Sequence, residues 1–257
     1  MDDLVGAVLK AIRDAGVEKE TMVVFLSDNG MSLPFSKTNC YLHSTHTPLI
    51  VKIPGVTKAK TVDDKNFING IDFMPTVLDV ANIAIPKGLD GRSFLPILKG
   101  NKQENRDCVF TEITETSGKK RYPMRAVQNK TYGYIFNPWS DDIRIFKNES
   151  QTGRTFPAMV AASATNPQIA ARVEFFEKRV PEEFYDFAKD PDALHNLIND
   201  PTYKKEIIKM QALMEKHLKE SNDPVFTVFE NRNDKSSLNR KLRIKIFSLG
   251  FNALQYK

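Results

Sequence analysis

The sequence predicts an α/β fold followed by a small antiparallel sheet with helices, and three features carry that prediction. A helix-like N-terminal segment leads into a continuous apolar run at residues 21–26, which stops at the polar turn 27–30. Beyond residue 107 the pattern changes to short strands separated by turns. With 257 residues, 41% of them apolar, the chain has room for one large or two ordinary domains with packed cores.

The first elements read as a helix and a buried strand. Apolar residues recur with helical spacing at Leu4, Val8 and Ile12 before a stop at Gly16. The run 21–26 is rich in β-branched residues and lacks polar alternation, which is typical of a strand buried on both faces of a parallel sheet. Such a sheet needs several strands, so we expect the others to lie outside this chain.

The remaining elements follow in order. We expect a strand at 48–53, a helix at 71–83 with Pro75 in its first turn, and a short closing turn at 95–98. We then expect strands at 108–114, 122–128 and 132–136, a long loop at 141–165, helices at 169–178 and 203–218, and strand-like alternation at 241–246. The predicted domains are 1–105, part of an α/β domain whose other strands lie elsewhere; 106–224, a sheet-and-helix subdomain; and 225–257, a tail.

Composition excludes several classes of protein. No apolar run reaches the roughly 20 residues of a membrane span, so we expect none. The net charge of +5 is too small and too dispersed to predict a nucleic-acid partner. Two cysteines cannot form a disulfide framework, and the acidic first residues do not resemble a secretory signal.

The strongest candidate site is the turn Ser27-Asp28-Asn29-Gly30, directly after the buried run. Asp28 offers a carboxylate and Asn29 a carbonyl oxygen, both of which suit calcium or magnesium. On spacing alone, an ordinary turn in which both side chains bond their own backbone is the better interpretation. Lys37 follows nine residues after Asp28 and could meet an anion, although alone it reads as a surface lysine.

Other polar residues leave their roles open. His43 and His46 could meet an anion or transfer a proton, but the nearby Pro48 argues against the helix face that a zinc pair would need. Arg125 could reach an acidic substrate or pair with a neighbouring acid. Two glycosylation acceptor patterns begin at Asn129 and Asn148.

Taken together, these segments resemble the sulfatase family. The stretch TMVVFLSDNGMSLPFSKTNCYLHSTHTPLIVKIPG looks like the late catalytic segment of sulfatases. INGIDFMPTVLDVANI and EEFYDFAKDPDALHNLINDPTYKKEI resemble later sulfatase segments, and YPMRAVQ is similar to the heparan N-sulfatase subgroup. The resemblance covers residues 1–224 and implies the C-terminal part of an alkaline-phosphatase-like fold.

The resemblance implies a hydrolase of sulfated glycans, with heparan-type sugars as the expected substrate. Such enzymes use a formylglycine nucleophile and a calcium ion; by motif match, Asp28 and Asn29 would be calcium ligands. Lys37 would contact the sulfate, and His46 is a second candidate for substrate binding. The expected compartment is periplasmic, secreted or lysosomal.

The catalytic nucleophile has no counterpart here. No C/S-x-P/A-x-R motif occurs, and the family's Asp-Asp pair has no matching strand. We therefore expect a C-terminal half that is inactive alone and needs an N-terminal half as its partner. Two alternatives stay open: a phosphoesterase of the same superfamily, or a non-catalytic glycan-binding remnant.

Overall fold

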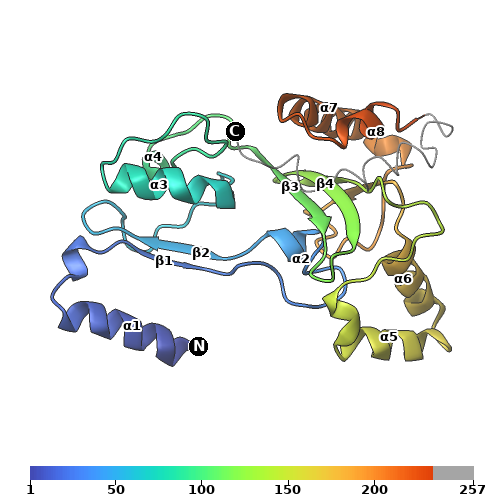
Figure 1. Cartoon of the computed structure of the whole chain (residues 1–257), viewed down its shortest axis with the longest axis horizontal. Coiled ribbons are helices and arrows are strands. Elements are labelled where there is room, and N and C mark those ends of the chain that lie inside the picture. Colours follow the sequence, from blue (N-terminus) through green and yellow to red (C-terminus); the bar gives the residue numbers. More distant parts are fainter. Residues whose placement is uncertain (234–257) are drawn as a thin grey trace. The chain divides into compact units, whose positions relative to one another are not determined.

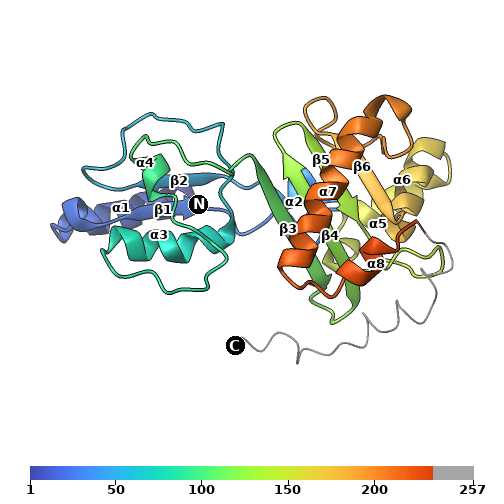
Figure 2. The same ribbon diagram turned by 90° about the horizontal axis from the view of Figure 1, so that it is seen from above.

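The structure, a computed structural model, describes residues 1–233 and divides into two compact units, each drawn in Figures 1 and 2. The first unit consists of Met1–Asp28 and Thr47–Val109. The second consists of Asn29–His46 and the chain from Phe110 onward. The loop after Asp28 is therefore part of the second unit, although the strands on either side of it in the sequence belong to the first.

The first unit contains the elements that the sequence predicts, at slightly shorter lengths. They are α1 (Asp2–Asp14), β1 (Val23–Leu26), β2 (Leu49–Lys52), α3 (Phe73–Val80) and the one-turn α4 (Leu95–Leu98). Pro75 lies in the first turn of α3, where its missing N–H costs no helical hydrogen bond. Within this unit α1 runs along one side of the strands, and α3 lies on the other (Figure 1).

The prediction of a parallel, doubly buried strand is wrong for the described residues. β1 pairs antiparallel with β2, with Val24 opposite Val51, in a two-stranded ribbon. Phe25 is 37% exposed and Leu26 48% exposed. A continuous apolar run predicts that both faces will be covered, but it does not specify the direction of the neighbouring strand. In this structure, residues 1–233 cover the ribbon only in part and leave Phe25 and Leu26, two consecutive residues of the strand, exposed.

A buried polar network fixes the loops of the first unit. The carboxylate of Asp72 accepts hydrogen bonds from the backbone N–H groups of Asn69 and Arg92, each at 2.9 Å. The guanidinium of Arg106 pairs with the same carboxylate, and both side chains are almost fully buried. Because a buried charge is tolerated only when paired and hydrogen-bonded, this cluster ties the turn before α3 to the segments that precede and follow α4.

The second unit is built on a four-stranded sheet of order β3-β4-β5-β6, in which β4–β5 and β5–β6 pair antiparallel. Its strands are β3 (Cys108–Glu115), β4 (Arg121–Asn129), β5 (Tyr132–Phe136) and β6 (Glu182–Asp186). Its helices are α2 (Leu42–Thr45), α5 (Thr155–Ser163), α6 (Pro167–Lys178), α7 (Lys204–Glu220) and α8 (Phe226–Glu230).

Most of these elements confirm the predictions, and a few correct them. The sequence analysis did not predict β6, and it assigned α5 to a long loop. It also argued against a helix around His43, yet α2 forms one turn there. The segment 225–257, predicted as a tail, contains α8. The alternation expected at 241–246 lies outside the described residues.

Both faces of the sheet in the second unit are covered. α7 and α8 lie over one face, while α5 and α6 lie toward the other (Figures 1 and 2). All seven residues between the ends of β4 are buried. The aromatic core on the α5–α6 side includes three residues of the 29–46 segment, namely Phe35, Cys40 and Tyr41. The loop that carries Lys37 is therefore anchored in a packed core.

Within residues 1–233, no helix has both the length and the apolar character that a membrane span requires.

Candidate functional site

The predicted metal ligands follow directly after β1. Ser27 closes the ribbon by donating its backbone N–H to the Pro48 carbonyl at 3.3 Å. Asp28 comes next and is exposed, while Asn29 is half-buried. The boundary between the two units falls between these consecutive residues. Their oxygens are of the kind that calcium prefers, but two residues supply only part of the six to eight ligands it takes.

The residues described supply no complete metal site. Among residues 1–233, no group of three or more His, Cys, Asp or Glu side chains could hold a metal ion. The donor set at Asp28 and Asn29 fits calcium in kind and falls short in number.

Gly30 is required because neighbouring atoms lie too close to its Cα for a side chain, not because of its backbone angles. A Cβ at this position would lie 1.9 Å from the carbonyl oxygen of His43 and 2.3 Å from Oγ of Ser36. Its N–H also donates to the Ser44 carbonyl at 3.1 Å. The turn after Asn29 is thus pressed against the segment 36–44, and any other residue here would force the loop apart.

Lys37 lies on a turn that is held from several sides. Its backbone N–H donates to the Met31 carbonyl at 3.0 Å. Its carbonyl accepts from Nδ2 of Asn39 at 3.0 Å and from Nδ2 of Asn148 at 3.1 Å. The ammonium of Lys37, by contrast, has no ion-pair or hydrogen-bond partner among the described residues. The turn therefore fixes the backbone and leaves the cation available for an anion.

The two histidines of this loop are both exposed. His46 follows the last residue of α2, and its side chain has no partner among the described residues. Nε2 of His43 lies 2.7 Å from a carboxylate oxygen of Asp192. The role of His46 in substrate binding stays a prediction.

A buried carboxylate binds Tyr41, which lies in the same loop as Lys37. Glu183 on β6 is completely buried and accepts hydrogen bonds from the hydroxyls of Tyr41 at 2.8 Å and Tyr185 at 2.6 Å. Nδ2 of Asn137 donates to its other oxygen at 2.6 Å. Burial, together with this carboxylate, raises the pKa of both tyrosines, so each keeps its proton and remains a donor.

Arg125 serves the fold of the second unit. Its Nε lies 2.6 Å from Oδ2 of Asp223, and its Nη2 donates to Oδ1 at 3.3 Å. The guanidinium is almost fully buried, so of the two roles left open above, the structure favours pairing with a neighbouring acid. Asn148, one of the glycosylation acceptors, has its Nδ2 bonded to Lys37 and its Oδ1 bonded to Ser150, so the folded chain does not offer it for modification.

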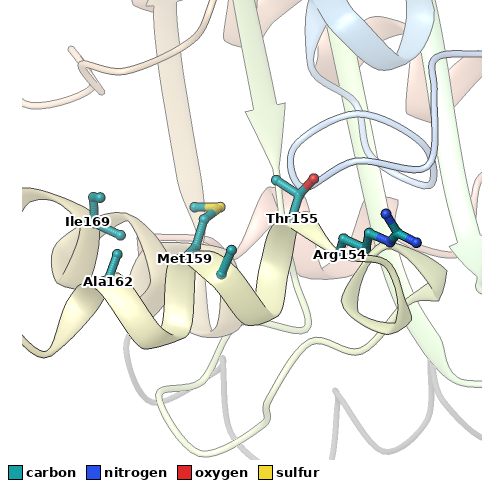
Figure 3. A pocket seen from close by; sticks show the side chains of 6 residues that line it. Arg154, Thr155, Met159, Ala162 and Ile169 are labelled. Atoms are coloured by element: carbon teal, nitrogen blue, oxygen red, sulfur yellow. The ribbon is translucent and has the colours of Figure 1, made fainter.

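A shallow apolar groove of about 490 Å³ runs along α5 and α6 in the second unit (Figure 3). It is lined by Arg154, Thr155, Ala158, Met159, Ala162 and Ile169. None of the predicted site residues lines it.

Sequence reasoning missed the residues that support Lys37. Asn39 and Tyr41 occur in the quoted stretch TNCY, but nothing in their spacing indicated that they face a buried arginine and a buried glutamate. Arg179 and Glu183 lie about 140 residues further along the chain, and neither belongs to a local pattern that predicts a site.

Comparisons with known proteins indicate which class of protein this chain resembles. The family model for the C-terminal part of N-sulphoglucosamine sulphohydrolase matches residues 31–147. Human N-sulphoglucosamine sulphohydrolase is 29% identical over 240 residues, which cover 87% of this chain and 46% of that protein. An ulvan-active sulfatase of Formosa agariphila is 27% identical over 85% of this chain and 36% of that protein.

A solved structure agrees with these sequences. A 2-O GAG sulfatase superposes with a TM-score of 0.64 at 25% identity, over 87% of this chain and 41% of that one. The chain therefore has part of the alkaline-phosphatase-like fold. Within that fold it is similar to sulfatases, and the matching family model describes the C-terminal part of one of them. It spans less than half the length of the curated relatives it matches.

Proposed function

We propose that this chain forms the C-terminal part of a sulfatase that hydrolyses sulfated saccharides, with heparan-type sugars as the first substrates to test. The observation that carries the proposal is the Lys37 turn. It follows an Asp-Asn-Gly turn, its backbone is fixed, and its ammonium has no partner among residues 1–233. A cation held in place before the reaction stabilises the negative charge that develops on the sulfate oxygens. Sequence similarity to sulfatases across most of the chain supports the same conclusion.

In this proposal Asp28 and Asn29 donate two oxygens to a calcium ion, and further ligands come from outside residues 1–233. Bound calcium would supply a positive charge against the sulfate group. Of the two, Asp28 contributes the charge that offsets ion dehydration, whereas Asn29 contributes a neutral oxygen. Lys37 binds the sulfate, and His46 is proposed to contact the saccharide.

The proposed partner is an N-terminal half that supplies the nucleophile, the remaining calcium ligands and further strands. The first unit offers a surface for it: α1 has no buried residue, and the ribbon β1–β2 has no third strand among the described residues. Apolar side chains stand exposed there, namely Leu4, Val8, Leu26, Ile50, Met74 and Val77. Many exposed large apolar side chains in one small unit favour burial against a partner.

The first experiment asks whether the chain alone acts on sulfate. Purified chain is incubated with calcium and with glucosamine N-sulfate or 4-nitrophenyl sulfate, and inorganic sulfate is measured. No release above that of a Lys37→Ala control is expected, because no formylglycine motif is present. Sulfate release that disappears in Lys37→Ala would contradict the need for a partner half.

The second experiment adds the partner. The DNA upstream of the coding sequence is read for a strand that ends in Asp-Asp and for a C/S-x-P/A-x-R motif, and that segment is expressed with this chain. Calorimetry should show calcium binding only in the combined form, lost in Asp28→Ala and weakened less in Asn29→Ala. Tight calcium binding by the chain alone that survives Asp28→Ala would reject the assigned ligands.

A further inference from the structure

An arginine outside the predicted site is held under strain at the base of the Lys37 turn. Arg179 follows the last residue of α6 with φ 56° and ψ −170°, a conformation that favours glycine. Its side chain is buried, and Nε has no hydrogen-bond partner in the described part of the chain. Strain and an unsatisfied N–H both count against arginine here, so its other contacts must favour it.

Those contacts are aromatic rings, one side-chain amide and one backbone carbonyl. The guanidinium carbon lies 4.8 Å from the ring centres of Phe35 and Phe176, and about as close to those of Tyr41 and Phe146, at 5.2 and 5.1 Å. Among residues 1–233 it forms no ion pair with a carboxylate. Its shortest hydrogen bond runs from Nη2 to Oδ1 of Asn39, at 2.6 Å. A longer bond runs from Nη1 to the Phe175 carbonyl at 3.3 Å, within the same helix end. The cation is therefore stabilised by π faces, and Asn39 is its one side-chain hydrogen-bond partner among the described residues.

This hydrogen bond fixes which way the Asn39 amide points. Arginine can only donate, so the amide must present its oxygen to Arg179 and its Nδ2 to the opposite side. There Nδ2 donates to the carbonyls of Ser36 at 3.2 Å and Lys37 at 3.0 Å. Asn39 thus links the buried cation to the backbone of Lys37.

The turn that carries Lys37 depends on such support. Phe35 and Thr38, on either side, have φ values of 64° and 61°, which are unfavourable for side chains of their size and branching. Backbone of this kind persists only where surrounding contacts hold it. Asn148 and Glu149 provide such contacts from outside the loop, and Asn39, oriented by Arg179, provides another from within it.

We propose that Arg179, acting through Asn39, is a positioning residue that orients Lys37 toward the sulfate group, an inference that rests on the proposed function. Asn39→Asp is the sharpest test. The carboxylate keeps a partner for Arg179 but faces the Ser36 and Lys37 carbonyls without a proton to donate. It therefore breaks the link to Lys37 while keeping the buried contact.

The experiment follows Lys37 directly. Lysines are labelled by reductive ¹³C-dimethylation, the Lys37 signal is assigned by its loss in Lys37→Arg, and sodium sulfate is titrated against sodium chloride of equal ionic strength. The wild-type signal should shift saturably, and Asn39→Asp and Arg179→Lys should weaken the apparent affinity at least tenfold. Arg125→Lys, a buried arginine of the same unit outside the link, is the control and should bind sulfate as the wild type does.

A second measurement separates the two hypotheses. Hydrogen exchange of the Lys37 amide, which is bonded to Met31, reports the turn whether or not sulfate binds. Faster exchange of the Lys37 amide in Asn39→Asp than in Arg125→Lys supports the positioning role. This holds even if the wild type does not bind sulfate and the proposed function fails. Unchanged exchange at Lys37 in Asn39→Asp, or sulfate affinity equal to that of the wild type, would overturn the inference.

Discussion

The two units of this chain bury their apolar residues to very different degrees. In the second unit β4 lies within a four-stranded sheet, and the seven residues between its ends are all buried. In the first unit β1 pairs with one strand, and no residue of α1 is buried. Both regions have the apolar pattern of a core. The difference shows that an apolar sequence pattern indicates which side chains favour burial. It does not show that the residues that bury them belong to residues 1–233.

The units also differ in how they use buried charge. The first has one network, centred on Asp72 and Arg106, that ties its loops together. The second has the buried Arg125–Asp223 pair and a cluster around Glu183, whose partners Tyr41 and Tyr185 belong to the aromatic core. We expect the second unit to fold cooperatively by itself, since the buried charges of Arg125, Asp223 and Glu183 are paired or hydrogen-bonded within it.

The largest expected effect comes from breaking the buried pair of the second unit. Asp223→Ala leaves the Arg125 guanidinium without its main partner, and we expect a loss of about 3–5 kcal/mol in the free energy of unfolding. Denaturant unfolding followed by far-UV circular dichroism measures it. Glu174→Ala, which removes an exposed pair with Lys178, should leave the midpoint unchanged. A loss in Asp223→Ala no larger than in this control would show that the buried pair does not stabilise the unit.

The next effect compares one methionine from each unit. Met210 on α7 is fully buried, whereas Met74 on α3 is 58% exposed. Met210→Ala should cost about 2–5 kcal/mol, because it leaves a cavity beside the sheet. Met74→Ala should stay within about 0.5 kcal/mol in the chain alone. Equal losses in the same unfolding assay would mean that the surface of the first unit is already covered in solution.

The sequence predicted much of the fold because its signals were local. Helical spacing gave α1 and α7, and apolar runs gave β1, β2 and β5. The direction of the β1–β2 pairing was missed because a continuous apolar run carries no information about its neighbour. β6 was missed because its acidic residues include Glu183, which is buried only because it accepts bonds from two tyrosines and an asparagine.

The candidate site was predictable only in part, for the same reason. Asp28, Asn29 and Lys37 lie within ten residues of one another, and their order resembles a known family. The support beneath Lys37 depends on Arg179, which is distant in sequence and adopts a backbone conformation that no propensity favours for arginine. Tertiary contacts between segments that are distant in sequence form this support.

A smaller effect is expected from the pH dependence of the second unit. His217 on α7 stacks on Phe110 at 3.9 Å, and burial lowers its pKa below the usual 6.5, although the nearby Asp223 and Glu112 oppose the shift. Because the unfolded chain binds this proton more readily, stability should fall as the pH drops from about 6.5 through the lowered pKa. His217→Phe keeps the stacking and removes the titration, so its unfolding midpoint should lose less between pH 8 and pH 5 than the wild type's. An equal loss would assign the effect to other groups.

The smallest expected effect is a difference in the labelling rates of the two cysteines. Burial raises the pKa of Cys40, in the core of the second unit, to about 12, and it also raises that of the half-buried Cys108. At pH 8 a thiol reagent should modify Cys108 first and Cys40 only as the second unit unfolds, because the thiolate is the reactive form. Cys40→Ser and Cys108→Ser assign the two phases. Rapid labelling of Cys40 in the native chain would contradict its place in the core.

We expect the second unit to be stable within this chain, whereas the proposed partner would cover the exposed apolar side chains of the first unit. Native-state hydrogen exchange, read by mass spectrometry on peptides from each unit, tests this expectation most directly. Amides of β4, β5 and β6 should exchange at least about 100-fold more slowly than those of β1 and β2, because a two-stranded ribbon is marginal in water. Equal protection of both sets of strands in the isolated chain would contradict the expectation.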